Sequence, residues 1–366
     1  MASTSEPAPR RRAQPGPGLR DHGDTQVPPG HLDLAVNVHP DPPPGLAQVL
    51  AGLDVTAYPD PARARDLLAA RHGVTAEEVL LINGAAEAFW ALAHALAPGT
   101  RAGLVHPSFT APEAALRSAG HEVRQVLRRA EDDFVLDPDQ VGEDLDVVVL
   151  GRPDNPTGRS EDVAQLRRLL RPGRLLVVDE AFAEHTGDGL GLSAERAALP
   201  GLVQVRSLTK VWGAAGLRMG YVVADAPVVR ALAATLQPWP VNAVALAVLE
   251  RLFAVEHRDA VEVERRRRGA VVATARTRLV AALRDRGLQV WAGEANFVLV
   301  RAPGTDLRTE LLAQGVAVRR ADTFPGLDRS FVRVAVHPDP TVTDRFLIAL
   351  DALERPGPAD RAARPR

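Results

Sequence analysis

Lys210 is the residue whose type points most directly to chemistry. The 366-residue chain contains 44 lysine and arginine residues together, and Lys210 is its single lysine, so the other 43 are arginines. Arginine makes salt bridges and phosphate contacts well, but near neutral pH it does not lose a proton and attack a carbonyl carbon. Lys210 is therefore either a catalytic or cofactor-binding amine, or the last lysine in a chain whose composition has drifted toward arginine.

Other chemically capable side chains follow apolar segments that are typical of buried strands. Asp179 ends the apolar segment 175–178, and a buried carboxylate is costly without a cationic partner such as a protonated ring nitrogen or an arginine. The remaining candidates are the hydroxyls of Ser207 and Thr209 with the guanidinium of Arg218, small residues at the helix start Ala85 and Ala86, the aromatic Phe109, and Asn155 in a turn framed by prolines. Each of the last three groups also has an ordinary interpretation, as a tight turn, a core side chain or a turn residue.

Taken together, these groups match one class of ligand. An amine binds an aldehyde, a carboxylate pairs with a protonated ring nitrogen, an aromatic side chain stacks on a flat ring, and hydroxyls with a guanidinium bind a phosphate. Pyridoxal phosphate has all four features. The sequence therefore predicts pyridoxal phosphate as the cofactor, Lys210 as the catalytic residue, and no metal site.

The elements that must position these residues alternate between apolar strands and amphipathic helices over residues 51–245. Continuous Val and Leu runs are typical of strands buried on both faces, which predicts a three-layer α/β domain with a mainly parallel sheet. Ligands bind at the carboxyl ends of the strands in such sheets. Residues 246–354 begin with a long helical stretch and continue with mixed strands and helices, which predicts a smaller α+β domain that residues 19–50 complete.

The composition argues against binding to nucleic acid or membranes and against secretion. The net charge of −2 indicates no general attraction to nucleic acid or anionic membranes, and no apolar run has the length of a membrane span. The ends, residues 1–18 and 355–366, are rich in Pro, Arg and Ala and are expected to be disordered, and neither has the pattern of a signal peptide. Because the chain lacks cysteine, a cytoplasmic setting is the default expectation. The run Arg265–Arg268 is expected to form a solvated helix face rather than an anion-binding patch.

The order of the motifs NGAAE, HPSF, NPTG, VVDEAF and SLTKVWGAAGLRMGY, followed by NFVLV and VRVAV, resembles the fold-type I pyridoxal phosphate enzymes. Among these it is most similar to the histidinol-phosphate aminotransferase family, over nearly all of the chain between the tails. The resemblance implies that Lys210 binds the cofactor aldehyde. It assigns the other cofactor contacts as follows: Asp179 to the ring nitrogen, Asn155 to the ring hydroxyl, Phe109 to the ring face, and Ala85, Ala86, Ser207, Thr209 and Arg218 to the phosphate.

The same resemblance implies a homodimer, because Tyr58 matches the family tyrosine that reaches the cofactor phosphate of the neighbouring subunit. One position departs from the family pattern. Phe182 stands where the family aminotransferases usually carry a tyrosine that also bonds the ring hydroxyl. Its loss is expected either to alter how protons are handled at the site or to be tolerated with little consequence.

Two arginines near the C-terminus are candidates for substrate binding. Arg319 and Arg333 are expected on paired strands, and the family uses arginines here for a substrate carboxylate or phosphate. A salt-bridged surface position is the alternative, and it fits Arg319 better than Arg333. Arg320 should point to the opposite side of its strand.

The N-terminal segment bears on the reaction. His22 and Gly23, followed by Asn37 in an Asn-x-x-Pro pattern, resemble the family branch that includes the L-threonine-O-3-phosphate decarboxylase of cobalamin biosynthesis. The resemblance implies that these three residues help to bind the substrate phosphate. With Phe182, it favours decarboxylation of L-threonine O-3-phosphate to aminopropanol phosphate. Transamination of the histidinol-phosphate type and an inactive regulator with this fold stay open, whereas no G-x-G-x-x-G motif follows the first strand to support a nucleotide-binding oxidoreductase.

Overall fold

The computed structural model describes residues 19, 27–187 and 189–353, and its largest feature is a seven-stranded sheet. The neighbouring strands β4, β3, β5, β6 and β7 run parallel, and β8 is antiparallel to both of its neighbours. The expected mainly parallel α/β architecture is therefore confirmed. In order across the sheet, the strands are β2 (Val79–Asn83), β8 (Met219–Val223), β7 (Leu202–Ser207), β6 (Leu175–Glu180), β5 (Val147–Gly151), β3 (Arg101–His106) and β4 (Glu122–Leu127).

The central strands are buried on both faces, as their Val and Leu runs predict. In β5, Val147 and Val149 pack with helices on one side of the sheet, whereas Val148 and Leu150 pack into a second cluster on the other side. Burial of one such side chain contributes roughly 1.5–3 kcal/mol, so a strand that buries every residue is held firmly between its helical layers. This rigidity fixes the carboxyl ends of the strands.

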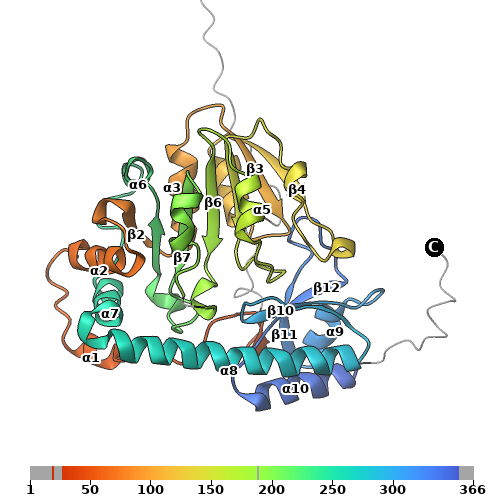
Figure 1. The fold of residues 1–366 in the computed structure, drawn as a ribbon. Coiled ribbons are helices and arrows are strands. Elements are labelled where there is room, and N and C mark those ends of the chain that lie inside the picture. The colour runs from red at the N-terminus through yellow and green to blue at the C-terminus, as the bar shows by residue number, and fades with distance from the viewer. Residues whose placement is uncertain (1–18, 20–26, 188, 354–366) are drawn as a thin grey trace, which may run out of the picture.

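A smaller sheet of five strands lies beside the first (Figure 1). Its first strand comes from the N-terminal segment and pairs in parallel with β11, while the other pairings are antiparallel. Helices α8 and α10 pack on this sheet through a cluster of buried Val and Leu side chains. In order, the strands are β1 (Leu32–Leu34), β11 (Val316–Arg320), β12 (Phe331–Ala335), β10 (Phe297–Arg301) and β9 (Gln289–Trp291).

Ten α-helices and seven short 3₁₀ helices connect the strands in the described part of the chain. The α-helices are α1 (Leu46–Ala51), α2 (Ala62–His72), α3 (Ala85–Ala95), α4 (Ala111–Ser118), α5 (Val163–Arg168), α6 (Ala226–Ala233), α7 (Ala243–Phe253), α8 (Arg258–Asp285), α9 (Leu307–Ala313) and α10 (Pro340–Asp351). The 3₁₀ helices are η2 (Ala76–Glu78), η3 (Ala130–Asp132), η4 (Pro138–Gln140), η5 (Ala183–His185), η6 (Ser193–Ala198), η7 (Ala215–Leu217) and η8 (Val255–His257). None of the described helices is long and apolar enough to cross a membrane.

Helix α8 links the two sheets. Its 28 residues correspond to a length of about 42 Å, and Figure 1 shows it running beneath both parts of the molecule. The expectation of a solvated arginine face on this helix is wrong for half of the run. Arg265 and Arg268 are 2% and 4% exposed, because their i, i+3 spacing turns both toward the large domain, where they donate to main-chain carbonyls. Only Arg266 and Arg267 face solvent.

Candidate active site

Lys210 and Asp179 lie at the carboxyl ends of the neighbouring parallel strands β7 and β6. Asp179 pairs in register with Val205, and Lys210 follows the end of β7 by three residues. The Asp179 carboxylate accepts a hydrogen bond from the main-chain amide of Ala181 at 3.0 Å. Burial raises its pKa from 3.8 to about 7, and the nearby positive charge of Lys210 acts in the opposite direction. The side chain nevertheless keeps some accessible surface, so a ligand can reach it.

Asn155 and Phe109 occupy the loops that follow β5 and β3, on the same edge of the sheet. The register of β5 with β6 pairs Gly151 with Asp179, which brings the Asn155 loop next to the carboxylate. Arg333 donates a hydrogen bond to Asn155 Oδ1 at 2.7 Å. Phe109 is half-buried and packs edge-on against Phe89, with ring centroids 6.5 Å apart.

A set of hydrogen-bond donors surrounds the start of α3. Gly84 precedes this helix with φ 81°, and no side chain caps the free amides of its first turn, which include those of Ala85 and Ala86. A Cβ atom on Gly84 would lie 2.5 Å from Nη2 of Arg218, so the guanidinium sits against the helix start. The cause is the antiparallel pairing of β2 with β8, which places Asn83 opposite Met219.

Two hydroxyls at the end of β7 complete this set of hydrogen-bond donors. Ser207 Oγ and Thr209 Oγ1 are buried and lie 2.9 Å apart. Free helix amides, two hydroxyls and a guanidinium are the donors that a phosphate dianion requires. An amine, a carboxylate with a raised pKa and an aromatic side chain lie on adjacent strand ends, so the residues present fit pyridoxal phosphate.

Arg319 and Arg333 face each other directly in the small sheet, where β11 pairs with β12. Both are buried, at 5% and 6% exposure, rather than at the surface. Arg333 donates to Asn155 and to the carbonyl of Ala35, and both acceptors are neutral. Burial and the adjacent Arg319 lower the pKa of Arg333 to about 9, so it stays protonated at neutral pH and favours an incoming anion.

Arg320, the residue after Arg319 in β11, has a different environment from Arg319. Arg320 forms a two-bond ion pair with Asp322, with nitrogen to oxygen distances of 2.5 and 2.6 Å. Arg319 donates to Thr323 and stacks over the ring of Phe324. Arg319 and Arg320 thus point to opposite sides of β11, as strand alternation requires.

Asn37 lies buried next to the small sheet. The main-chain carbonyl oxygen of Asn37 accepts a hydrogen bond from the side chain of Asn296 at 2.8 Å. The side-chain nitrogen of Asn37 has no hydrogen-bond partner within the described residues. An amide nitrogen of this kind is available to an acidic ligand. The other two N-terminal candidates, His22 and Gly23, lie outside the described residues.

Tyr58, unlike the buried candidates Arg319, Arg333 and Asn37, lies on the surface. Its ring is 76% exposed and stacks on Trp239, with centroids 4.2 Å apart and an interplanar angle of 16°. Trp239 is itself 54% exposed. An exposed stacked aromatic pair is typical of a surface that another molecule covers.

Phe182 is packed firmly in the loop that follows β6. It is 4% exposed, contacts Ala295, and lies edge-on to Phe297 with ring centroids 5.0 Å apart. The position therefore offers an apolar ring and no hydroxyl. His185 in the same loop is also buried, and burial lowers its pKa to about 3, so this imidazole is neutral.

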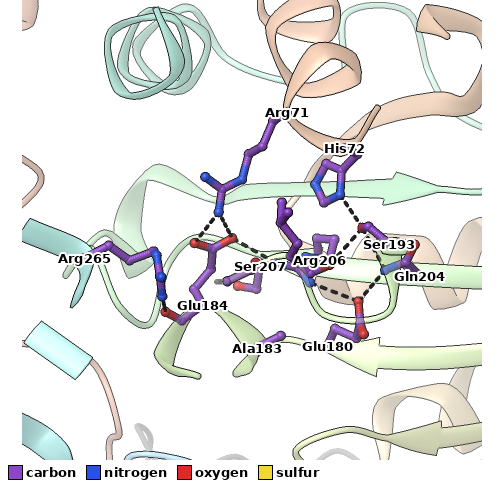
Figure 2. A network of polar contacts seen from close by, with 12 residues as sticks. Arg71, His72, Glu180, Ala183, Glu184, Ser193, Gln204, Arg206, Ser207 and Arg265 are labelled. Carbon is purple, nitrogen blue, oxygen red and sulfur yellow. Dashed lines mark hydrogen bonds and ion pairs between the residues drawn. The ribbon is translucent and has the colours of Figure 1, made fainter. Parts of the chain in front are cut away.

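The structure adds a polar cluster that the sequence analysis missed. Glu180 follows Asp179 in β6 and Arg206 precedes Ser207 in β7, so alternation along the strands sends both to the face opposite these two site residues. Arg206 donates to Glu180 and to Glu184 at 2.9 Å each, and Arg71 donates to Glu184 as well (Figure 2). The clue in the sequence is the second carboxylate in VVDEAF, which has the same burial cost as the first.

The chain is similar to known proteins over most of its length. A family model described as aminotransferase class I and II matches residues 31–350. A histidinol-phosphate aminotransferase of Mycobacterium tuberculosis is 43% identical over 333 residues, covering 87% of each chain. A threonine-phosphate decarboxylase of Salmonella typhimurium is 31% identical over 348 residues, covering 90% of this chain and 93% of the relative.

A solved structure confirms the fold-type I architecture. The L-threonine-O-3-phosphate decarboxylase from Porphyromonas gingivalis superposes with a TM-score of 0.75 at 27% identity, covering 87% of this chain and 98% of that chain. Matches of this extent leave no large part of the described chain outside the common fold. The chain therefore belongs to the aminotransferase class I and II family, and it is a pyridoxal phosphate-dependent enzyme.

Proposed function

We propose that the enzyme acts on a small phosphorylated amino acid, and that it decarboxylates L-threonine O-3-phosphate to aminopropanol phosphate. The observation that carries this choice is Phe182, which is buried against Phe297 and lacks the hydroxyl usual in the aminotransferases of the family. The similarity to threonine-phosphate decarboxylases supports it. The activity would place the enzyme in cobalamin biosynthesis and in the cytoplasm.

The arrangement of the strand ends supports the proposed cofactor contacts. Lys210 would hold the cofactor aldehyde and Asp179 the protonated ring nitrogen, while Asn155 would bond the ring hydroxyl and Phe109 would cover the ring face. A carboxylate in a buried position favours the protonated ring nitrogen because each charge offsets the desolvation of the other. The cofactor phosphate would be held at the start of α3 by the amides of Ala85 and Ala86 and the side chains of Ser207, Thr209 and Arg218.

Substrate binding relies on the buried arginines. Arg333 would hold the substrate carboxylate, because its guanidinium already donates to Asn155, the residue proposed to contact the cofactor ring. Arg319 and the side-chain nitrogen of Asn37 bind the substrate phosphate. His22 and Gly23 are proposed to join them.

The bound cofactor supplies an electron sink for the bond that breaks at the substrate Cα. The residues of the chain would decide which bond this is, through the direction in which they hold the substrate. Arg333 fixes the direction of the carboxylate, and the Lys210 amine delivers a proton to Cα after carbon dioxide leaves. The apolar ring of Phe182 keeps water away from this side of the site.

Transamination of the histidinol-phosphate type is the second candidate. It is favoured by the 43% identity to the Mycobacterium tuberculosis protein of that name. In that reaction Lys210 takes the proton from Cα instead of delivering one. The inactive regulator that the sequence left open is set aside, because the chain belongs to a family of pyridoxal phosphate-dependent enzymes.

The enzyme is proposed to be a homodimer with shared active sites. Tyr58 is exposed in the single chain, and its stack on Trp239 presents a flat aromatic surface. In the dimer its hydroxyl reaches the cofactor phosphate of the partner subunit.

The reaction is tested with the holoenzyme and L-threonine O-3-phosphate. Release of carbon dioxide without an added 2-oxo acid is the expected result, and Lys210→Arg, which keeps the charge but not the amine chemistry, should abolish it. Strict dependence on 2-oxoglutarate, with glutamate as a product, would overturn decarboxylation in favour of transamination. Phe182→Tyr is the matched variant, and it should shift the ratio of the two reactions toward transamination.

A further inference from the structure

Asp154 is a fully buried carboxylate one residue before Asn155. Three side chains donate hydrogen bonds to it: Ser108 to Oδ1 at 2.6 Å, Thr157 to Oδ2 at 2.9 Å, and Arg128 to Oδ2 at 2.7 Å. A single carboxylate therefore collects donors from three different segments of the chain. None of these residues belongs to the cofactor contacts proposed above.

Arg128 forms the other half of this group. It is 3% exposed, and besides Asp154 it donates to Glu161 at 3.0 Å and to the carbonyl of Pro107 at 2.8 Å. Its own amide donates to the carbonyl of His106 at 2.7 Å. We call the five side chains Ser108, Arg128, Asp154, Thr157 and Glu161 the loop-joining cluster.

The loop-joining cluster includes the residues that precede Phe109 and Asn155, the two proposed contacts to the cofactor ring. Ser108 precedes Phe109, and Asp154 precedes Asn155, so each loop is held at the residue next to its proposed functional side chain. A Cβ atom on Gly151 would lie 2.6 Å from Asp154 Oδ1, so the carboxylate packs tightly on the end of β5. Gly151 is the register partner of Asp179, and the charge of Asp154 contributes to the raised pKa of that carboxyl.

We propose that Asp154 and Arg128 are positioning residues, which set Phe109 and Asn155 relative to Asp179 and thereby shape the cofactor ring site. The inference rests on the ring contacts proposed for Phe109 and Asn155. Buried ion pairs contribute little net stability compared with well-packed apolar groups, because desolvation offsets their attraction. The ion pair of Asp154 with Arg128 instead fixes the relative orientation of the two loops, since each hydrogen bond restricts an angle as well as a distance.

The decisive variant is Asp154→Asn. It keeps the shape of the side chain, but it removes the negative charge that pairs with Arg128. An amide oxygen that stays toward Arg128 and Thr157 also puts an amide nitrogen against Ser108, whose hydroxyl must then accept a hydrogen bond instead of donating one. The control is Asp144→Asn, because Asp144 is also a carboxylate that accepts hydrogen bonds from arginine, here from Arg124 and Arg101, but at the surface. Both variants remove the negative charge of one carboxylate that pairs with arginine.

Two quantities are measured on the holoenzyme: the dissociation constant of pyridoxal phosphate and the rate of amide hydrogen exchange by segment. For Asp154→Asn we expect at least a tenfold weaker cofactor affinity and faster exchange in segments 106–110 and 152–159, with strands β6 and β7 unchanged. Asp144→Asn should match the wild type in both. Unchanged exchange in the two segments, or exchange that is equally faster in every strand, overturns the inference, because the latter is the signature of a purely structural role.

A second variant decides the matter if Asp154→Asn does not fold. Ser108→Ala removes one donor and leaves the ion pair intact, so we expect about threefold weaker cofactor binding and faster exchange confined to segment 106–110. Wild-type values for both would overturn the inference. Asn155→Ala separates this question from the proposed function: if it binds the cofactor as the wild type does, the ring contact of Asn155 is wrong, while the exchange rates still test the cluster.

Discussion

The raised pKa of Asp179 gives a prediction about the stability of the cofactor-free protein. When the cofactor and its protonated ring nitrogen are absent, the charge of Lys210 still favours the ionised carboxylate but does not outweigh its burial. Burial raises its pKa from 3.8 to about 7, so the site stores an electrostatic cost in the apo state. Replacing Asp179 with Asn removes the ionisation and keeps the shape.

The sign and size of the effect follow from linkage. Between pH 3.8 and about 7 the unfolded chain has lost the proton while the folded chain still holds it, so stability falls as pH rises through this window. A difference of about three pH units corresponds to about 4 kcal/mol at full effect. Because the carboxylate keeps some accessible surface, we expect Asp179→Asn to gain about 2 kcal/mol above pH 7 and nothing near pH 4.

The assay is urea unfolding of the apo protein at several pH values, for wild type, Asp179→Asn and the control Asp144→Asn. Arg124 lowers the pKa of the exposed Asp144, so the control should show no gain that grows with pH. A gain for Asp179→Asn that is the same at every pH would refute the electrostatic reasoning. The same variant should bind pyridoxal phosphate more weakly, since the ring nitrogen loses its counter-charge.

Three further predictions address other parts of the molecule. Arg206→Met should lower the free energy of unfolding by about 3–5 kcal/mol, measured in urea, because Glu180 and Glu184 are left buried without this cation. Phe182→Tyr should lower the pH at which the absorbance of the bound cofactor changes, measured by spectral titration, since a hydroxyl near the ring makes the bound amine nitrogen less basic; an unchanged titration would contradict this. Tyr58→Ala and Lys210→Ala should each be inactive alone, and mixed dimers should regain activity if the sites are shared, whereas mixtures without activity would argue against sharing.

Much of the large domain could be predicted from the sequence because its signals are local. Val and Leu runs identify strands buried on both faces, and parallel strands gather their carboxyl ends at one edge, so Lys210, Asp179 and Asn155 were expected near each other. Arg319 and Arg333 were also expected on paired strands, and the structure places them directly opposite each other. The buried positions of Arg265 and Arg268 could not be predicted, because an arginine-rich helix has no local feature that distinguishes a solvated guanidinium from one that bonds distant carbonyls.

The polar residues of β6 and β7 show where sequence reasoning needs the register. Asp179 and Glu180 are adjacent in the chain, as are Arg206 and Ser207, and composition alone suggests one mixed cluster. The parallel register pairs Glu180 with Arg206, and the two-residue period of a strand then puts both on the face away from Asp179 and Ser207. One face can therefore carry a carboxylate and a hydroxyl that await a ligand, because the other face satisfies its own charges internally (Figure 2). Exchanging Glu180 for Asp179 in this role would need a one-residue slip of β6, which would also turn the Val and Leu side chains of that strand to the wrong helical layers.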